Sequence, residues 1–168
     1  AGLPCWAVGQ AITTAAAQCV GAERPARAVE SLRVGLALAV GVTLAMQALV
    51  QLFAPQLVAA LGAQTPAVAD AAVLYLRVTC SVNGIFYAAM YAFDSFALAV
   101  GAPRVVLANS LSDAFLGRVG LAVLLGAAGL GYVGVFAAQA ASPVLPSVVG
   151  ALYARHWAKR HAGQDETL

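Results

Sequence analysis

Long apolar runs dominate the chain, and short polar or glycine- and proline-containing segments separate them. A bilayer core is crossed by roughly 20 helical residues at about 1.5 Å each, so runs of this length predict membrane-spanning helices. We expect about five spans, over residues 3–20, 32–53, 68–100, 105–125 and 133–153. Residues 155–168 are expected to form a polar tail. The run over residues 68–100 is the longest, and it also contains polar side chains that are costly in lipid.

Prolines and glycines mark the expected ends and kinks of these helices. We expect Pro55 to end the second span, with a short interfacial helix over residues 56–63. Pro143 and Pro146 should kink the fifth span. Four small residues of the second span, Gly35, Ala37, Gly41 and Ala45, are spaced for close helix contact.

The segment from Gly101 to Arg104 is predicted to be a tight turn. Pro103 cannot donate a backbone hydrogen bond, so neither neighbouring helix should continue through it. Gly101 can adopt a positive φ, which other residues resist. Arg104 would then lie at the start of the fourth span, where anionic lipid headgroups, or a nearby acidic side chain such as Glu23 or Glu30, would stabilise it. We expect Arg104 to fix the turn at the membrane surface and to have this structural role only.

The composition excludes an ordinary soluble domain. Of 168 residues, 62% are hydrophobic and 10% are charged, whereas soluble domains are about 45–50% apolar and 25% charged. Lipid offers no partners for backbone groups, so a bundle of helices follows. A barrel is disfavoured because the apolar runs are continuous and do not alternate. The sequence therefore predicts an all-α integral membrane protein.

The distribution of basic residues predicts the orientation. Lys and Arg occur in the first connection, the third connection and the tail, at Arg24, Arg27, Arg33, Arg104, Arg155, Lys159 and Arg160. The second and fourth connections contain none. Basic residues favour the cytoplasmic side. We therefore expect an amino terminus outside, a cytoplasmic tail, and a multi-pass protein of the plasma (inner) membrane.

Several polar and aromatic residues of the third and fourth spans are candidates for a transport pathway. Asp94 lies about 8 residues before the Gly101 turn and Asp113 about 11 after it, which places both roughly 12–17 Å along their helices. Facing a cavity, they could hold a proton or attract a cationic substrate; alternatively, each hydrogen-bonds a neighbouring helix or caps a helix irregularity. Tyr87 and Tyr91 suit a lipophilic cation, although helix packing explains them equally well. Asn83 is a further polar candidate on the same span.

Two arginines form a second group within the spans. Arg77 and Arg118 each lie some 8–9 residues from the outer end of a helix. We expect both side chains to extend outward to the membrane surface, as arginine near a helix end commonly does. Were they inside a cavity instead, they would suit an anionic headgroup.

The order of four segments resembles the carboxy-terminal lobe of MATE (multidrug and toxic compound extrusion) transporters. The segments are VGQAITTAAAQCVGAERPARA, LFAPQLVAALGAQTPAVADAAVLYLRV, ALAVGAPR and GRVGLAVLLG, and together they cover nearly all of the chain. The sequence departs from the family pattern at Ala99, where members have the first of two turn glycines, and at Gly120, where they have proline. Tyr87 lies near the place of an acidic cation ligand in some members.

This resemblance implies a partial secondary active transporter. Members export organic cations or drugs by cation-coupled antiport, with proton or sodium as the coupling ion and no cofactor. They have two six-helix lobes, and only about five helices of one lobe are present here, so we expect a second lobe, from a missing upstream half or another chain. Two alternatives stay open: a lipid or polysaccharide flippase of the same fold, and a non-transporting membrane remnant that packs with a partner.

Other function classes lack their sequence signals. The chain has no HExxH, Gly-x-Ser-x-Gly or GKS/T motif, so we expect no enzyme activity. His156 and His161 lie in the polar tail, and the three cysteines share no close spacing, so no metal site is expected. No basic face suits a nucleic acid.

Overall fold

The computed structural model describes residues 2–60 and 65–161. They form α1 (Gly2–Gly21), α2 (Pro25–Ala60), α3 (Pro66–Ala99), α4 (Pro103–Leu111), η1 (Ser112–Gly120), α5 (Leu121–Leu125), η2 (Gly126–Leu130), α6 (Gly131–Ala141) and α7 (Val144–His161). Element η1 is π-helical, with i→i+5 hydrogen bonds. Element η2 contains a kink at Gly129, whose φ is 85°. No strand occurs in these described ranges, and the predicted all-α class is confirmed.

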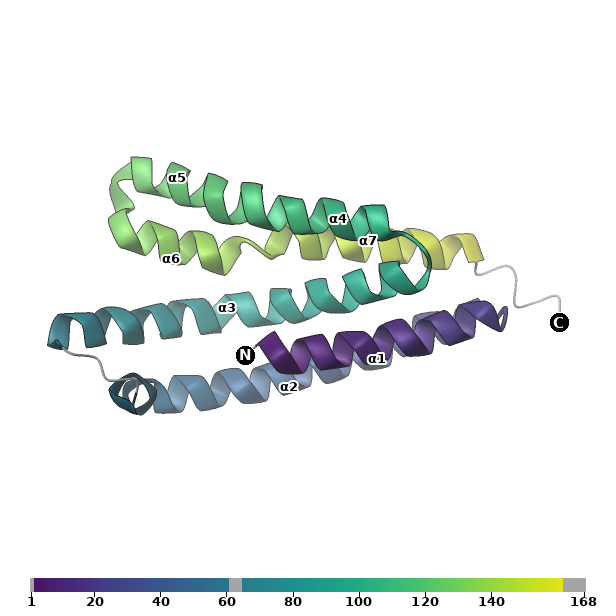
Figure 1. Cartoon of the computed structure of the whole chain (residues 1–168), viewed down its shortest axis with the longest axis horizontal. Coiled ribbons are helices and arrows are strands. Elements are labelled where there is room, and N and C mark those ends of the chain that lie inside the picture. The colour runs from purple at the N-terminus through teal and green to yellow at the C-terminus, as the bar shows by residue number, and fades with distance from the viewer. Residues whose placement is uncertain (1, 61–64, 162–168) are drawn as a thin grey trace.

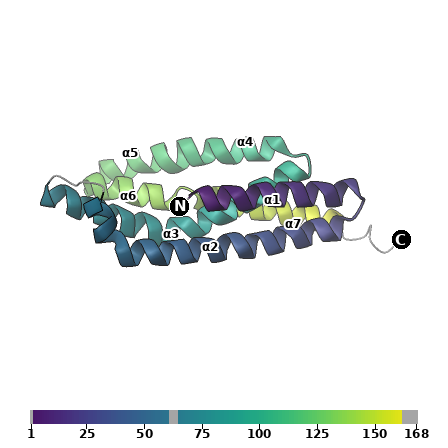
Figure 2. The same cartoon turned by 60° about the horizontal axis from the view of Figure 1, so that its bottom comes forward.

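Helix α3 lies at the centre of an elongated bundle. Figure 1 shows α1 and α2 on one side of it, and the α4–α5 and α6–α7 segments on the other. In Figure 2, α4–α5 lies along one edge of the bundle and α2 along the other, with α1, α3, α6 and α7 between them. Helix α3 contacts α1, α2, α4, α6 and α7. Polar side chains on α3 can therefore meet partners from both sides of the bundle.

Among the described residues, three helical segments are long and apolar enough to cross a membrane. They are Pro25–Ala60, Pro103–Gly129 and Val133–His161, and a fourth is α3 if its two parts, which meet at a bend of 47°, count as one span. The first of the five predicted spans forms helix α1, but α1 is not among the helices that are apolar enough to cross a membrane. Gln10 and Gln18 lower its hydropathy.

The predicted end of the second span at Pro55 is wrong. Helix α2 continues through Pro55 to Ala60, and the last turns of the helix change direction in Figure 1. The expected interfacial helix over residues 56–63 is thus the end of α2 as far as Ala60, and residues 61–63 lie outside the described ranges. A proline in a membrane helix is tolerated because neighbouring groups satisfy the freed carbonyl.

The contact face of α2 differs from the predicted one. Gly35 is buried, and a Cβ there would meet the side chain of Ile12, as expected for a close helix contact. Ala37, Gly41 and Ala45 are exposed. The buried face instead continues from Gly35 in steps of four residues, through Ala39, Thr43 and Gln47. Two of these side chains are polar, so α2 presents hydrogen-bonding groups to α3.

The two predicted interruptions after α3 are present. Gly101 has a φ of 79°, which confirms the turn, and Pro103 is the first residue of α4. The fifth span is divided into α6 and α7 at residues 142–143, where Pro143 lies. Helix α7 continues to His161, so the first seven residues of the predicted tail are helical, and residues 162–168 lie outside the described ranges.

The core is made mainly of small side chains. Its largest cluster contains Ile12, Ala16, Ala28, Leu32, Ala92, Phe96 and Ala154. The ring of Phe96 meets that of Trp157 edge to face, with centroids 5.2 Å apart, and this contact joins α3 to α7. Small residues allow the close helix approach on which association in a membrane depends.

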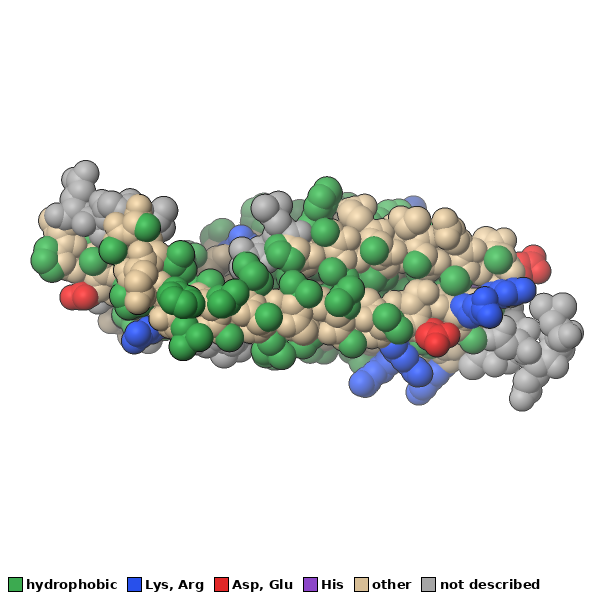
Figure 3. Space-filling model, turned by 90° about the horizontal axis from the view of Figure 1, so that it is seen from below, with side chains coloured by type: hydrophobic (Ala, Val, Ile, Leu, Met, Phe, Trp, Pro, Cys, Tyr) green, Lys and Arg blue, Asp and Glu red, His purple; other side chains and the backbone are tan. Residues whose placement is uncertain are grey.

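The surface separates apolar and basic regions. Hydrophobic side chains cover the middle of the face in Figure 3, whereas most of its visible Lys and Arg gather near one end. The α1–α2 turn, the α3–α4 turn and the end of α7 all lie at one end of the bundle in Figure 1. The basic segments are therefore brought together, and the cytoplasmic location of this end stays a prediction.

Candidate functional site

The Gly101 turn folds α4 back along α3 and brings Asp94 to Asn109. The Asn109 side chain donates a hydrogen bond from Nδ2 to Oδ1 of Asp94 over 2.7 Å. Asp94 is 9% exposed and Asn109 2%. A short hydrogen bond to a carboxylate is stronger than one between neutral groups. The pair therefore holds a buried acid in place between two helices.

Asp113 and Arg118 form an ion pair within η1. Nε and Nη2 of Arg118 lie 3.0 and 2.9 Å from Oδ2 of Asp113. Residues five apart point in different directions on an α-helix, but the i→i+5 repeat of a π-helix places them one turn apart on the same side. The π-helical conformation of η1 thus makes this pair. The other oxygen of Asp113, Oδ1, is buried without a hydrogen-bond partner in the described structure.

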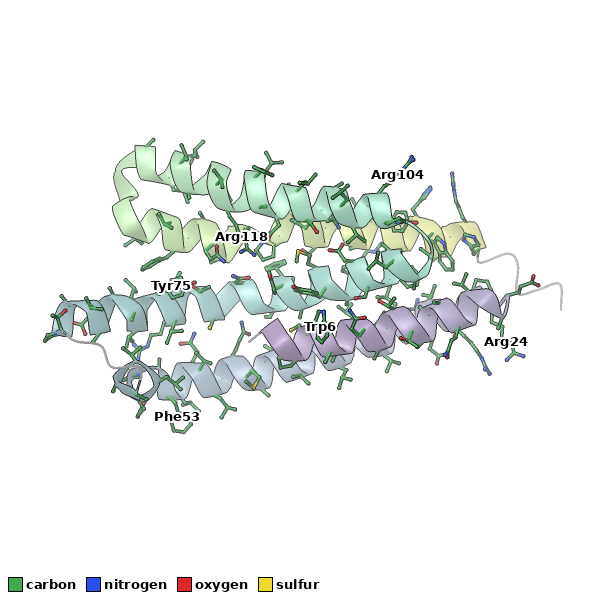
Figure 4. All side chains as sticks on the ribbon, in the orientation of Figure 1. Trp6, Arg24, Phe53, Tyr75, Arg104 and Arg118 are labelled. Atoms are coloured by element: carbon green, nitrogen blue, oxygen red, sulfur yellow. The ribbon has the colours of Figure 1, made fainter. Side chains whose placement is uncertain are left out.

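Tyr87 connects this ion pair to α3. Its hydroxyl accepts a long hydrogen bond of 3.5 Å from Nη2 of Arg118. The ring of Tyr87 also meets that of Tyr91 edge to face, with centroids 5.0 Å apart. Figure 4 shows Arg118 between the α4–α5 segment and α3. The candidates Asp113, Tyr87 and Tyr91 are therefore neighbours across the α3–η1 contact.

Asn83 belongs to a cavity of about 340 Å³ between α1, α2, α3, η1 and α6. We call it the Gln47 pocket, and its polar lining includes Thr43, Gln47, Thr79, Asn83, Tyr87 and Arg118. Nδ2 of Asn83 donates to the backbone oxygen of Gln139 over 3.0 Å. Asp94 and Asp113 are not among the lining residues. The pocket and the acids are therefore adjacent, because Arg118 lines the pocket and is bound to Asp113.

The three arginines Arg77, Arg104 and Arg118 differ in their exposure and contacts. The Arg118 side chain contacts Asp113 and Tyr87 and is 39% exposed, so its outward extension to the membrane surface stays a prediction. Arg77 is exposed, and its backbone oxygen accepts a hydrogen bond of 2.9 Å from the side chain of Gln51. Arg104 is exposed at the start of α4, and Figure 4 shows its side chain pointing away from the bundle.

Sequence reasoning did not single out three residues that the structure places at these sites. Asn109 is the partner of Asp94, and Gln47 and Thr79 line the Gln47 pocket. Each is a polar residue in a long apolar helix, which was the available signal, because such residues usually face protein or a cavity. The five-residue spacing of Asp113 and Arg118 did not predict an ion pair, because residues five apart point in different directions on an α-helix.

Comparison with known proteins identifies the family. The sequence model of the MatE family matches residues 1–124. A search of curated proteins gave no match. An inward-facing multidrug resistance MATE family transporter of the MOP superfamily superposes with a TM-score of 0.83 and 18% identity, over 95% of this chain and 36% of that one. An outward-facing one gives a TM-score of 0.82 and 19% identity, over 94% and 34%.

The chain spans about one third of the length of these solved transporters. Their low identity supports the fold alone, whereas the family match covers most of the chain. The chain therefore belongs to the MatE family of membrane transporters.

Proposed function

We propose that the chain is one lobe of a secondary active transporter that exports organic cations by cation-coupled antiport. The observation that carries this proposal is its near-equal fit to an inward-facing and an outward-facing transporter, with TM-scores of 0.83 and 0.82. Alternating access in such carriers is largely a rigid-body movement of one helix bundle against another. A lobe that keeps its shape in both states is what this movement requires.

A second lobe is part of the proposal. The chain covers 36% and 34% of the two solved transporters, so most of their structure has no counterpart in it. A single lobe cannot enclose a central cavity. The second lobe would come from an upstream half, for which about 270 apolar residues in seven spans would suffice, or from a partner chain.

The buried acids are the proposed residues of ion coupling. Asp94 is bound to Asn109, and Asp113 keeps one buried oxygen without a partner in the described structure. A buried carboxylate oxygen without a hydrogen-bond donor is a position at which a proton or sodium ion would be stabilised. The remnant hypothesis expects both carboxylates to be fully satisfied by neighbouring helices, and Asp113 Oδ1 is not.

Substitution of the acids tests this proposal. In vesicles that hold the chain with its second lobe, Asp113→Asn and Asp94→Asn should each reduce gradient-driven efflux of a lipophilic cation by about tenfold or more. Asp70→Asn is the matched control, because Asp70 is an exposed carboxylate on the same helix as Asp94. Unchanged efflux in both variants, at normal membrane levels, would contradict a role of these acids in coupling.

A flippase of the same fold is the second candidate. One observation favours it: Arg118 lines the Gln47 pocket, where an anionic headgroup would need a positive charge. Asp113 already neutralises that arginine, at 2.9 Å. A headgroup would have to displace Asp113, so efflux that depends on Arg118 and not on either acid would support the flippase.

A further inference from the structure

A cavity of about 460 Å³ lies at the basic end of the bundle, between the start of α2 and the end of α7. We call it the Trp157 pocket. Its polar and aromatic lining residues are Glu30 and Arg33 from α2, and Trp157 and His161 from α7. Both helices belong to segments that are long and apolar enough to cross a membrane, and the pocket lies where one segment begins and the other ends. The cavity is therefore placed near the membrane surface.

The length of α2 supports this depth. Its 36 residues extend over about 54 Å, whereas roughly 20 residues cross the hydrocarbon core. The charged side chains of α2 are Arg27, Glu30 and Arg33, all in its first turns, and charges are costly in the core. Tryptophan is also enriched at the level of the lipid headgroups. The pocket is thus expected to face headgroups.

The Trp157 pocket presents two opposite charges. Glu30 and Arg33 are exposed, and their spacing of three residues places them on one side of α2, about 4.5 Å apart along its axis. Neither forms an ion pair with another of the described residues. Figure 3 shows acidic as well as basic side chains at this end of the bundle. A ligand that meets both residues must carry an anionic and a cationic group close together.

The order of the two charges matches the end of a phospholipid. Helix α2 begins at Pro25 and runs toward the membrane interior, so Arg33 is deeper than Glu30. In a phospholipid the phosphate is attached to the glycerol and acyl chains, and the amine lies beyond it, nearer to water. The exposed apolar residue Val34 follows Arg33 and offers surface to an acyl chain. A lipid that enters from the bilayer therefore presents its phosphate to Arg33 and its amine to Glu30.

The α7 wall of the pocket is held in place by its own contacts. The rings of Trp157 and His161 are stacked, with centroids 4.2 Å apart. Nδ1 of His161 donates a hydrogen bond of 2.9 Å to the backbone oxygen of Trp157, since a carbonyl oxygen only accepts. Trp157 also meets Phe96 of α3 edge to face. The cavity thus has a fixed aromatic wall opposite the two charged side chains of α2.

We propose that the Trp157 pocket binds the headgroup of phosphatidylethanolamine. The guanidinium of Arg33 donates hydrogen bonds to the phosphate, and the carboxylate of Glu30 accepts them from the primary ammonium. The cavity of about 460 Å³ is within the range of roughly 300–1,000 Å³ of known ligand sites. This site contains neither Asp94 nor Asp113, and its existence does not depend on the transport activity proposed above.

The test compares three lipids with identical acyl chains by native mass spectrometry of the purified chain. Phosphatidylcholine has no N–H to donate to Glu30, and phosphatidylglycerol has no cation. We expect phosphatidylethanolamine to bind about tenfold more tightly than either, because each of them loses a charge-assisted hydrogen bond. Equal affinities, or a preference for phosphatidylglycerol through the basic residues alone, would overturn the proposal. Soluble glycerophosphoethanolamine should not displace the lipid, and an affinity equal to that of the lipid would show that the ligand is a soluble molecule.

Variants locate the binding. Glu30→Gln and Arg33→Gln should each weaken phosphatidylethanolamine binding by about tenfold, and both side chains are exposed, so the fold should tolerate the changes. Arg27→Gln is the matched control, because Arg27 is an exposed basic residue of α2 outside the pocket lining. It should bind as the unchanged chain does. An equal loss in the control, or unchanged binding in both single variants, would contradict the site.

Reversal of the two charges tests the proposed orientation. The double variant Glu30→Arg with Arg33→Glu keeps the net charge of the pocket but places the acid deeper than the base. It should lose the preference for phosphatidylethanolamine, because the lipid phosphate would meet a carboxylate. A preference that survives the reversal would show that the order of the charges does not select the lipid, and the proposal would then be wrong.

Discussion

Replacing Asn109 with leucine tests the hydrogen bond between α3 and α4. Leucine is similar in size, so the change removes Nδ2 and leaves the buried Asp94 oxygen without its donor at 2.7 Å. Hydrogen bonds to charged groups contribute about 1.5–3 kcal/mol, and an unpaired buried acceptor adds its own desolvation cost. At an exposed fraction of 2%, Asn109 has no water to replace it. We expect the free energy of unfolding to fall by about 2–3 kcal/mol.

The assay is reversible unfolding in mixed micelles by a titration with sodium dodecyl sulfate, followed by far-ultraviolet circular dichroism. The control is the same substitution in an Asp94→Val background, where both partners are absent. There Asn109→Leu should cost less than about 1 kcal/mol, because replacing both partners with apolar groups is nearly neutral. A loss below about 0.5 kcal/mol in the native background, or equal losses in both backgrounds, would show that the Asn109–Asp94 hydrogen bond does not stabilise the chain.

Two further substitutions address packing and membrane insertion. A Cβ at Gly117 would lie 2.7 Å from Cβ and 2.8 Å from Cα of Ser142, so Gly117→Ala should destabilise the chain by about 1–3 kcal/mol in the same assay. Gly126→Ala, with nothing within 4 Å, should not, and equal effects would contradict the contact. Arg104→Gln should reduce correctly inserted protein, since a basic residue at an anionic surface contributes about 1 kcal/mol. Altered substrate preference at normal membrane levels would show that Arg104 belongs to the transport path.

Features that depend on local chemistry were predictable from the sequence. The turn at Gly101 follows from a residue that tolerates a positive φ, placed two residues before a proline that starts a helix. The interruption at Pro143 follows from its missing backbone donor. Helix α3 was predicted almost to the residue because its apolar run is long and ends at that turn.

Features that depend on distant partners were not predictable. Pro55 was expected to end a helix, yet α2 continues through it. The ion pair between Arg118 and Asp113 results from the π-helical repeat of η1, and no residue type specifies that repeat. The Gln47 pocket combines residues from α1, α2, α3, η1 and α6, so its composition follows from how the helices pack, which periodicity does not determine. Asn109 and Gln47 could be recognised as polar residues in apolar helices, but not assigned a partner.

The requirement for a second lobe is tested most directly by efflux from a drug-sensitive host. The chain is expressed alone, shown to be monomeric in the membrane, and compared with the same chain joined to an amino-terminal MATE lobe. We expect that the lone monomer leaves cellular retention of a lipophilic cation unchanged, whereas the two-lobe protein lowers it when an ion gradient is present. Gradient-dependent efflux by the proven monomer would contradict the proposal that this chain is one lobe of a two-lobe carrier.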